Sequence, residues 1–184
     1  MRGLRQTLLL QAVGALVLLA CGCRSPEGLQ LEPTDESVPV LKSSVRAGDQ
    51  DTSIQLLRGF HRLEENVWRW TMGRFSVVLL PPPGSNVLGA TLEMEISVPQ
   101  AVLDRSKSVK LTASVQGSEI GAQMYEATGD YQFTCAIPAS LLQRNVVGVD
   151  FALDPFIPSG VMDARELGVV FLSATLRRKD DPAQ

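Results

Sequence analysis

Residues 91–98 read TLEMEISV and decide the fold class of this chain. Leu92, Met94, Ile96 and Val98 alternate strictly with polar side chains. Successive side chains of a β-strand leave opposite faces of the sheet, so this alternation predicts a strand with one buried and one exposed face. The segment therefore indicates a sheet that packs on a core through a single face.

The same period of two recurs across residues 54–176, and turn residues such as the Pro-Pro-Pro-Gly run at 81–84 separate the repeats. About eight short strands at such spacing are typical of an antiparallel sandwich. The sequence therefore predicts an all-β fold, an antiparallel two-sheet β-sandwich that is jelly-roll-like, with helix confined to a turn near residues 139–143. The expected strands cover residues 54–60, 67–71, 74–80, 91–98, 109–115, 131–137, 147–153 and 166–176, and the last is apolar enough to be central.

The first 20 residues have the composition of a targeting segment. Arg2 and Arg5 precede an apolar run of 14 residues at 7–20. A membrane span needs about 20 apolar residues, so this run is too short for one. Its length suits the apolar region of a signal peptide, and residues 1–20 are therefore predicted to be one.

The apolar run ends in Leu18-Leu19-Ala20-Cys21, which resembles the lipobox of bacterial lipoproteins, with a less typical leucine two positions before the cysteine. The resemblance implies cleavage before Cys21, diacylation of its sulfur and acylation of its new amino group. The residue after Cys21 is Gly22 and not an aspartate. This resembles the pattern that sorts lipoproteins to the outer membrane rather than the pattern that retains them in the inner membrane. We therefore predict a lipid anchor in the cell envelope, on the periplasmic face of the outer membrane where the cell has two membranes, and two acyl chains make it stable. The alternatives are an uncleaved anchor and ordinary secretion with Cys21 as a thiol.

Residues 21–53 contain no aromatic side chain and are rich in Ser, Pro, Gly and charge. Such a composition does not bury enough apolar surface to fold alone, so it predicts a disordered tether with a mean span of about 30 Å. The alternative for residues 38–41, VPVL, is an edge segment packed on the domain. Residues 54–176 form the expected β-sandwich domain, and residues 177–184 form a polar C-terminal tail.

Charge and side-chain chemistry exclude several classes of function. The formal net charge of −3 supplies no basic field for nucleic acid. His61 is the only histidine, and three cysteines add little, so we predict no catalytic residue, no metal site and no cofactor. Asp150, Asp154 and Asp163 are weak candidates for calcium ligands, because they form no compact calcium-loop motif.

Cys135 lies on the inward face of the strand expected at residues 131–137. There it acts either as a small buried hydrophobe or as the partner of Cys23 in a disulfide formed in an oxidising compartment.

Two separated motifs carry a resemblance to a known family. Gly59-Phe60, Glu64 and the run at 68–71, WRWT, are followed near the C-terminus by DARELGV at 163–169. This order resembles a β-sandwich module of bacterial glycosyltransferases and related surface-polysaccharide proteins, over most of residues 59–176. The resemblance implies a jelly-roll-like fold similar in architecture to carbohydrate-binding domains. It supports the fold more than any activity, since one fold hosts many functions.

The two motifs also supply the candidate ligand or rim contacts. Alternation places two tryptophans on one face of a strand and an arginine on the other, as a sugar-stacking platform beside a hydroxyl-binding group. In the structural alternative, both tryptophans are buried and the arginine pairs with an acidic residue of the motifs. The charged residues before the last strand then form a salt bridge that fixes the start of that strand. The candidates are Glu64, Trp68, Arg69, Trp70, Asp163, Arg165 and Glu166.

Three functions are compatible with these features. We favour a non-catalytic envelope lipoprotein whose sandwich contacts envelope proteins or supports surface-polysaccharide assembly. The alternative is a carbohydrate-binding module that holds an envelope or surface glycan. A hydrolase is third, because no catalytic set of residues is identifiable by spacing.

Overall fold

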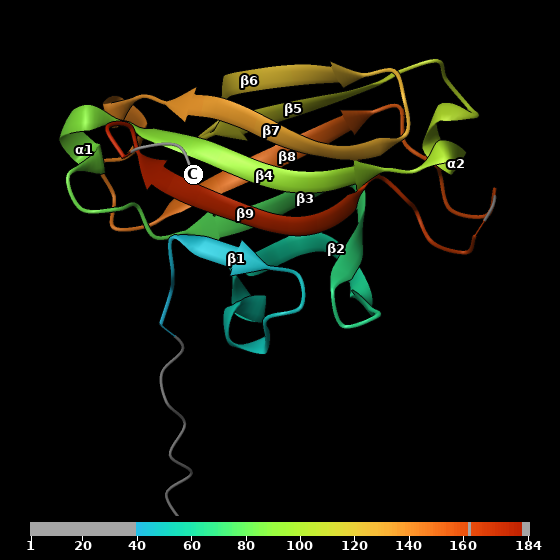
Figure 1. Cartoon of the computed structure of the whole chain (residues 1–184), viewed down its shortest axis with the longest axis horizontal. Coiled ribbons are helices and arrows are strands. Elements are labelled where there is room, and N and C mark those ends of the chain that lie inside the picture. Colours follow the sequence, from blue (N-terminus) through green and yellow to red (C-terminus); the bar gives the residue numbers. More distant parts are fainter. Residues whose placement is uncertain (1–39, 162, 182–184) are drawn as a thin grey trace, which may run out of the picture. The chain divides into compact units, whose positions relative to one another are not determined.

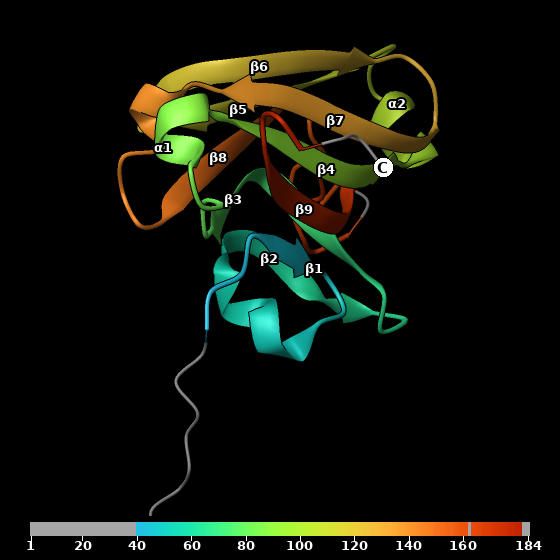
Figure 2. The same ribbon diagram turned by 60° about the vertical axis from the view of Figure 1, so that its left-hand side comes forward.

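Nine antiparallel strands form two layers in the part of the chain that the structure, a computed structural model, describes: residues 40–161 and 163–181. Figure 1 shows the front layer toward the viewer, and Figure 2 shows the same layers turned. The front layer has the order β1 (Ser44–Arg46), β9 (Val170–Arg178), β4 (Ala90–Val98) and β7 (Gly129–Ile137). The back layer has the order β2 (Leu56–Glu64), β3 (Trp68–Leu79), β8 (Val147–Asp154), β5 (Val109–Val115) and β6 (Ser118–Tyr125). The predicted all-β sandwich is confirmed.

Within residues 40–161 and 163–181, helical structure is confined to four short segments between the strands. Two are α-helical, α1 (Ser85–Leu88) and α2 (Gln100–Leu103), and two are 3₁₀ turns at Gln50–Gln55 and Ala139–Leu141. The last agrees with the turn predicted near residues 139–143. Within the described ranges, none of these helices has the length and apolar character to cross a membrane.

Strand β3 joins the two layers. Its residues 74–79 pair with β8 in the back layer, whereas Arg69 and Trp70 pair with β9 in the front layer. The change of partner falls around Gly73, where a side chain would collide with the ring of Phe156. The prediction of two strands at 67–71 and 74–80 was therefore wrong, because the inward alternation continues through Gly73 as a single bent strand.

The core lies between the layers and follows the predicted alternation. The four apolar side chains of TLEMEISV are all fully buried. Phe60 packs edge-on against both Phe75 and Phe171, with ring centroids 5.5 and 5.1 Å apart, and Phe75 stacks on Phe151 at 4.8 Å. Aromatic contacts of this kind add about 0.5–1.5 kcal/mol each beyond the burial of their area. Strands of both layers are thereby joined through one aromatic cluster.

The folded domain begins earlier than predicted. Residues expected in a disordered tether form β1, and Val45 at its centre is fully buried. The buried side chain of Gln55 bonds the backbone of both Lys42 and Val78, which holds this segment on the domain. The packed edge segment is Ser44–Arg46; of the segment considered at 38–41, only Val40 and Leu41 are described, and neither belongs to a strand. The strand expected at 54–60 begins at residue 56. The predicted signal peptide, Cys21 and residues 22–39 lie outside the described residues.

Two further strand predictions need correction. Strand β6 was missed, because its sequence, SEIGAQMY, lacks a strict alternation of buried and exposed residues. Strand β9 begins at Val170 and runs to Arg178, two residues into the expected tail. Residues 166–169 are instead held by Thr71, whose backbone and side chain bond Gly168 and Val169.

Replacement of Gly59 by alanine is expected to destabilise the domain. Gly59 has φ +76°, and an added Cβ would lie 2.7 Å from the Cα of Phe75. A left-handed backbone costs a non-glycine residue about 1–2 kcal/mol before any collision. Gly59→Ala should therefore lower the free energy of unfolding by more than about 1 kcal/mol. Chemical denaturation measures this, with Gly148→Ala as the matched control, since a Cβ there meets nothing within 4 Å. Equal stability of the two variants would contradict the expectation.

Candidate functional site

Arg165 connects two of the predicted contact residues at one corner of the domain. Its guanidinium donates to Glu64 Oε1 at 2.8 Å and to Asp163 Oδ2 at 2.9 Å. The hydrogen bonds that Asp163 accepts, first from the Arg165 side chain and then from the Arg165 backbone amide, lower the pKa of Asp163 below its ordinary value. The salt bridge that fixes the start of the last strand is thus present. Its arginine is Arg165, however, and not Arg69 as the structural alternative expected.

Glu166 ties the same loop to the point where β3 changes layers. Its Oε1 accepts a hydrogen bond from the amide of Gly73 at 2.8 Å. The carbonyl oxygen of Glu166 lies 2.6 Å from Nε2 of His61 on β2. The side chain and the backbone carbonyl of Glu166 are therefore both engaged within the protein. His61 lies at the rim of the same corner.

Arg69 holds β1 and β2 onto β3. Its Nε donates to the carbonyl of Ala47 at 3.1 Å, and its terminal nitrogen donates to the carbonyl of His61 at 3.1 Å. The expected carboxylate partners are replaced by backbone carbonyls, because Arg165 already occupies the carboxylates nearby.

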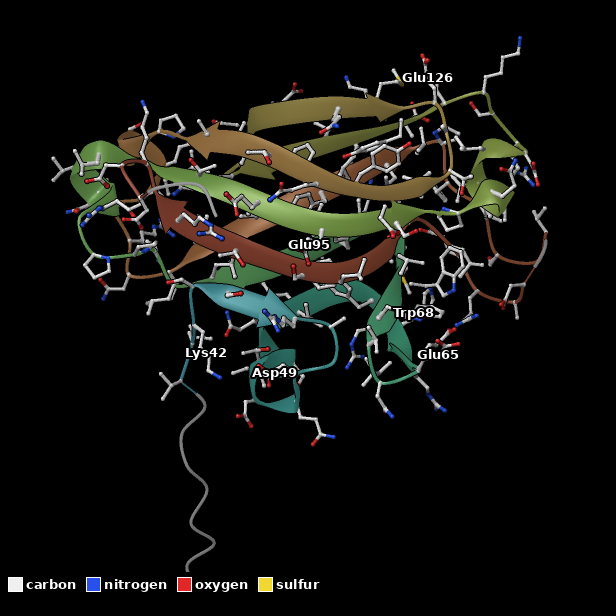
Figure 3. The ribbon with its side chains drawn as sticks, viewed as in Figure 1. Lys42, Asp49, Glu65, Trp68, Glu95 and Glu126 are labelled. Carbon is white, nitrogen blue, oxygen red and sulfur yellow. The ribbon has the colours of Figure 1, made fainter. Side chains whose placement is uncertain are left out.

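Trp68 and Trp70 lie on the same side of β3, as the alternation predicted. Their ring centroids are 6.4 Å apart and nearly perpendicular, and both side chains are partly buried. Trp70 packs against the edge of the core. Figure 3 labels Trp68 near the hairpin of β2 and β3. Neither ring lines the groove that occupies the front layer.

That groove lies on the outer face of the front layer and has a volume of about 610 Å³. Its floor is built from cross-strand rows of outward side chains, because Arg46 pairs with Ser173, Ser173 with Glu95, and Glu95 with Gln132. Figure 3 labels Glu95 in the middle of this face. The lining consists of Ser44, Arg46, Glu93, Glu95, Ile96, Asp130, Tyr131, Gln132, Leu172, Ser173, Thr175 and Arg177.

Hydrogen bonds between these side chains order the floor of the groove. Ser173 Oγ donates to Glu95 at 2.8 Å, and Arg177 Nε donates to Glu93 at 2.7 Å. The hydroxyls of Ser44 and Thr175 lie 2.8 Å apart. Each side chain keeps further donors or acceptors after these bonds, so the groove offers a ligand several fixed polar contacts.

A second hollow of about 410 Å³ continues the groove past β1. The two hollows share four residues, and the second adds four more. The shared residues are Arg46, Glu95, Leu172 and Ser173, and the added ones are Gly48, Asp49, Asn66 and Val67. Asp49 lies 3.9 Å from Lys42, and Figure 3 labels both below the front layer. The two hollows together, polar in the first and partly apolar at Val67 and Leu172 in the second, are what we call the front groove.

The front groove was missed by sequence reasoning. The outward residues of TLEMEISV, among them Glu93 and Glu95, were treated as a solvent face. A signal was available in their repetition, because the last strand carries Ser173, Thr175 and Arg177 on the same period. Nothing in the sequence indicates that these two strands are neighbours.

The acidic residues considered for calcium do not gather. Asp150 Oδ1 accepts from Ser76 at 2.5 Å and from Arg58 at 2.8 Å on the back layer, and Asp163 is bound by Arg165. Among residues 40–161 and 163–181, no group of three His, Cys, Asp or Glu side chains is arranged to hold a metal ion.

Cys135 lies on β7 and packs against Gly121 of β6. A Cβ at Gly121 would lie 2.7 Å from the Cβ of Cys135, which shows how closely the two strands approach. Burial raises the pKa of the Cys135 thiol to about 11, so it remains protonated at neutral pH. Its suggested disulfide partner, Cys23, lies outside the described residues.

No family model and no curated protein matches this sequence. Solved structures similar to the fold include β-sandwich carbohydrate-binding modules. The module CBM36 in complex with calcium and xylotriose is 9% identical, with a TM-score of 0.40 over 73% of this chain and 98% of that one. A CBM4 module is 11% identical, with a TM-score of 0.35 over 73% of this chain and 85% of that one.

A larger protein is also similar over the same region. It is the GH115 4-O-methyl-α-glucuronidase BtGH115A, described as specific for decorated arabinogalactans, at 7% identity and a TM-score of 0.45. The match covers 78% of this chain but only 18% of the glucuronidase. In all three cases the likeness lies in the arrangement of the strands.

The corner salt bridge predicts a change in one pKa. Arg165→Gln should raise the pKa of Asp163 toward its ordinary value, because the hydrogen bonds that favour the carboxylate are lost. Since the native pKa of Asp163 is lowered, its ionisation stabilises the fold above the unfolded pKa, and this contribution disappears as pH falls through the folded pKa. A carboxyl-carbon NMR titration measures the shift. Arg144→Gln, in the segment before β8, is the control, and an unchanged Asp163 pKa in Arg165→Gln would refute the assignment.

Proposed function

We propose that the β-sandwich is a non-catalytic module that binds a glycan in the front groove. The observation that carries this proposal is the polar lining of the groove's first hollow, built on four neighbouring strands. A glycan presents many hydroxyl groups along a chain, and each hydroxyl is able both to donate and to accept hydrogen bonds. The glycan-binding alternative thus takes precedence over the protein-interaction function that the sequence alone favoured.

The chemistry of the groove distinguishes a glycan from a protein partner. The buried centre of a protein interface is depleted of charged residues and enriched in apolar and aromatic ones. The centre of the front groove instead holds Glu95, Ser173 and Arg46, and its one aromatic side chain is Tyr131. The volume of its first hollow, about 610 Å³, falls in the range of small-ligand sites.

The carboxylates of the groove suit binding better than hydrolysis. Glycoside hydrolysis requires one carboxylic acid that gives a proton to the leaving oxygen and a second carboxylate that acts as nucleophile or base. Glu93 is held by Arg177 at 2.7 Å, and Glu95 accepts a hydrogen bond from Ser173 at 2.8 Å. Both carboxyl groups are therefore held in place as hydrogen-bond acceptors, which suits them to orient sugar hydroxyls.

Removal of the Glu95 carboxylate is expected to weaken glycan binding. A hydrogen bond to a charged group contributes about 1.5–3 kcal/mol, so Glu95→Ala should weaken affinity about 10-fold or more. The full chain, kept in solution with a detergent that contains no sugar, is screened on a glycan array, and the best ligand is titrated by calorimetry.

Glu119→Ala is the matched control, because Glu119 is exposed on β6 in the back layer. Circular dichroism establishes that both variants are folded. Glycan binding in this groove would be refuted if the wild-type protein bound no glycan on the array. It would also be refuted if Glu95→Ala and Glu119→Ala bound the best ligand with equal affinity.

We further propose that the module is anchored to the cell envelope through acyl chains on Cys21. This proposal is supported by the resemblance of residues 18–21 to a lipobox and by the apolar run before them. Cys21→Ser should abolish incorporation of labelled palmitate and move the protein from the membrane fraction to the soluble fraction. Cys23→Ser is the control and should keep both properties. Loss of label in Cys23→Ser rather than Cys21→Ser would contradict the assignment.

A further inference from the structure

We infer that Arg46 makes the front groove selective for glycans that carry isolated uronic acid residues, through an ion pair between its guanidinium and the sugar carboxylate. This inference rests on the proposed glycan-binding function. Arg46 is the last residue of β1 and lines both hollows of the groove. A ligand that extends from one hollow into the other therefore passes over this side chain.

Arg46 is the groove's available cation. Of the two arginines in the first hollow, Arg177 is already paired with Glu93. Arg46 makes no ion pair within residues 40–161 and 163–181, and its side chain is exposed. A guanidinium presents a planar fork of donors that matches the two oxygens of a carboxylate, so Arg46 is suited to hold a uronate in two parallel hydrogen bonds.

The backbone around Arg46 is held from both sides. The amide of Ala47 donates to the carbonyl of Leu172 at 2.8 Å, and the carbonyl of Ala47 accepts from Arg69 at 3.1 Å. Val45, on the other side of Arg46, is fully buried. These contacts fix the strand that presents the guanidinium, which reduces the entropy lost when a ligand binds.

The acidic side chains of the groove limit how much negative charge a ligand carries. Glu95 lies two strands from Arg46 in the same cross-strand row, and Asp130 lines the far part of the first hollow. Asp49 lines the second hollow, and Nζ of Lys42, which lies outside that lining, is 3.9 Å from Asp49 Oδ2. A continuous polyuronate would set its carboxylates against Glu95 and Asp130. A uronate bordered by neutral sugars instead meets Arg46, while its neighbours offer hydroxyls to the carboxylates.

The test compares two forms of one ligand. A xylo-oligosaccharide that carries a single glucuronic acid is titrated into the full chain in sugar-free detergent, beside the same oligosaccharide after reduction of its carboxyl group to the alcohol. The wild-type protein should bind the acidic form about 10-fold more tightly, the scale of one charge-assisted hydrogen-bonded pair. Arg46→Gln should bind both forms equally, at the affinity of the reduced form, and tetragalacturonate should bind more weakly than the singly charged ligand.

Arg62→Gln is the matched control, because Arg62 is exposed on β2 and lines neither hollow. It should keep the preference for the acidic form. If the wild-type protein binds the acidic and reduced forms with equal affinity, the role of Arg46 is overturned and the proposed function still stands. The same conclusion follows if Arg46→Gln keeps the preference for the acidic form. Failure of the wild-type protein to bind either form, tetragalacturonate or any glycan of the array overturns both the inference and the proposed function.

Discussion

The structure depends on a single strand that serves both layers. The C-terminal part of β3 pairs with β8 in the back layer, and its N-terminal part pairs with β9 in the front layer. Backbone hydrogen bonds must be satisfied wherever they are buried, so the strand needs a defined point at which its partners change. Gly73 supplies that point, because only a residue without a side chain fits against Phe156 while Glu166 binds its amide. The front and back layers are thereby held in one relative position.

The two sequence motifs at residues 59–71 and 163–169 converge on this crossing. Arg69 binds backbone carbonyls beside β1 and β2, and Arg165 joins Glu64 to the loop before β9. Exposed pairs of this type contribute little to stability individually. Their shared effect is geometric, since they hold β1, β2 and the C-terminal loop against β3. In this arrangement β1 becomes the edge of the front layer, where it completes the groove.

The front groove consists of side chains that the core does not use. Successive side chains of β4 and β9 point to opposite faces, so the residues between the buried apolar ones are turned outward. On this chain the outward residues carry carboxylate, hydroxyl and guanidinium groups in registered rows. Pairing of Ser173 with Glu95 and of Arg177 with Glu93 orders most of the floor, and Arg46 remains as a cation at the junction of the two hollows. The proposed ligand binding and the folding of the domain thus use opposite faces of the same strands.

The sequence by itself determined the fold class, because alternation in segments such as 91–98 records which face of each strand is buried. It also indicated that the two tryptophans share a side of their strand. Strand β6 escaped detection because an exposed edge imposes no alternation, and β1 because three residues are too few to show a period. Only the tertiary structure decided that Arg46, Ser173 and Glu95 form one row. Pairing between distant strands sets that register, and no local pattern of residues encodes which strands become neighbours.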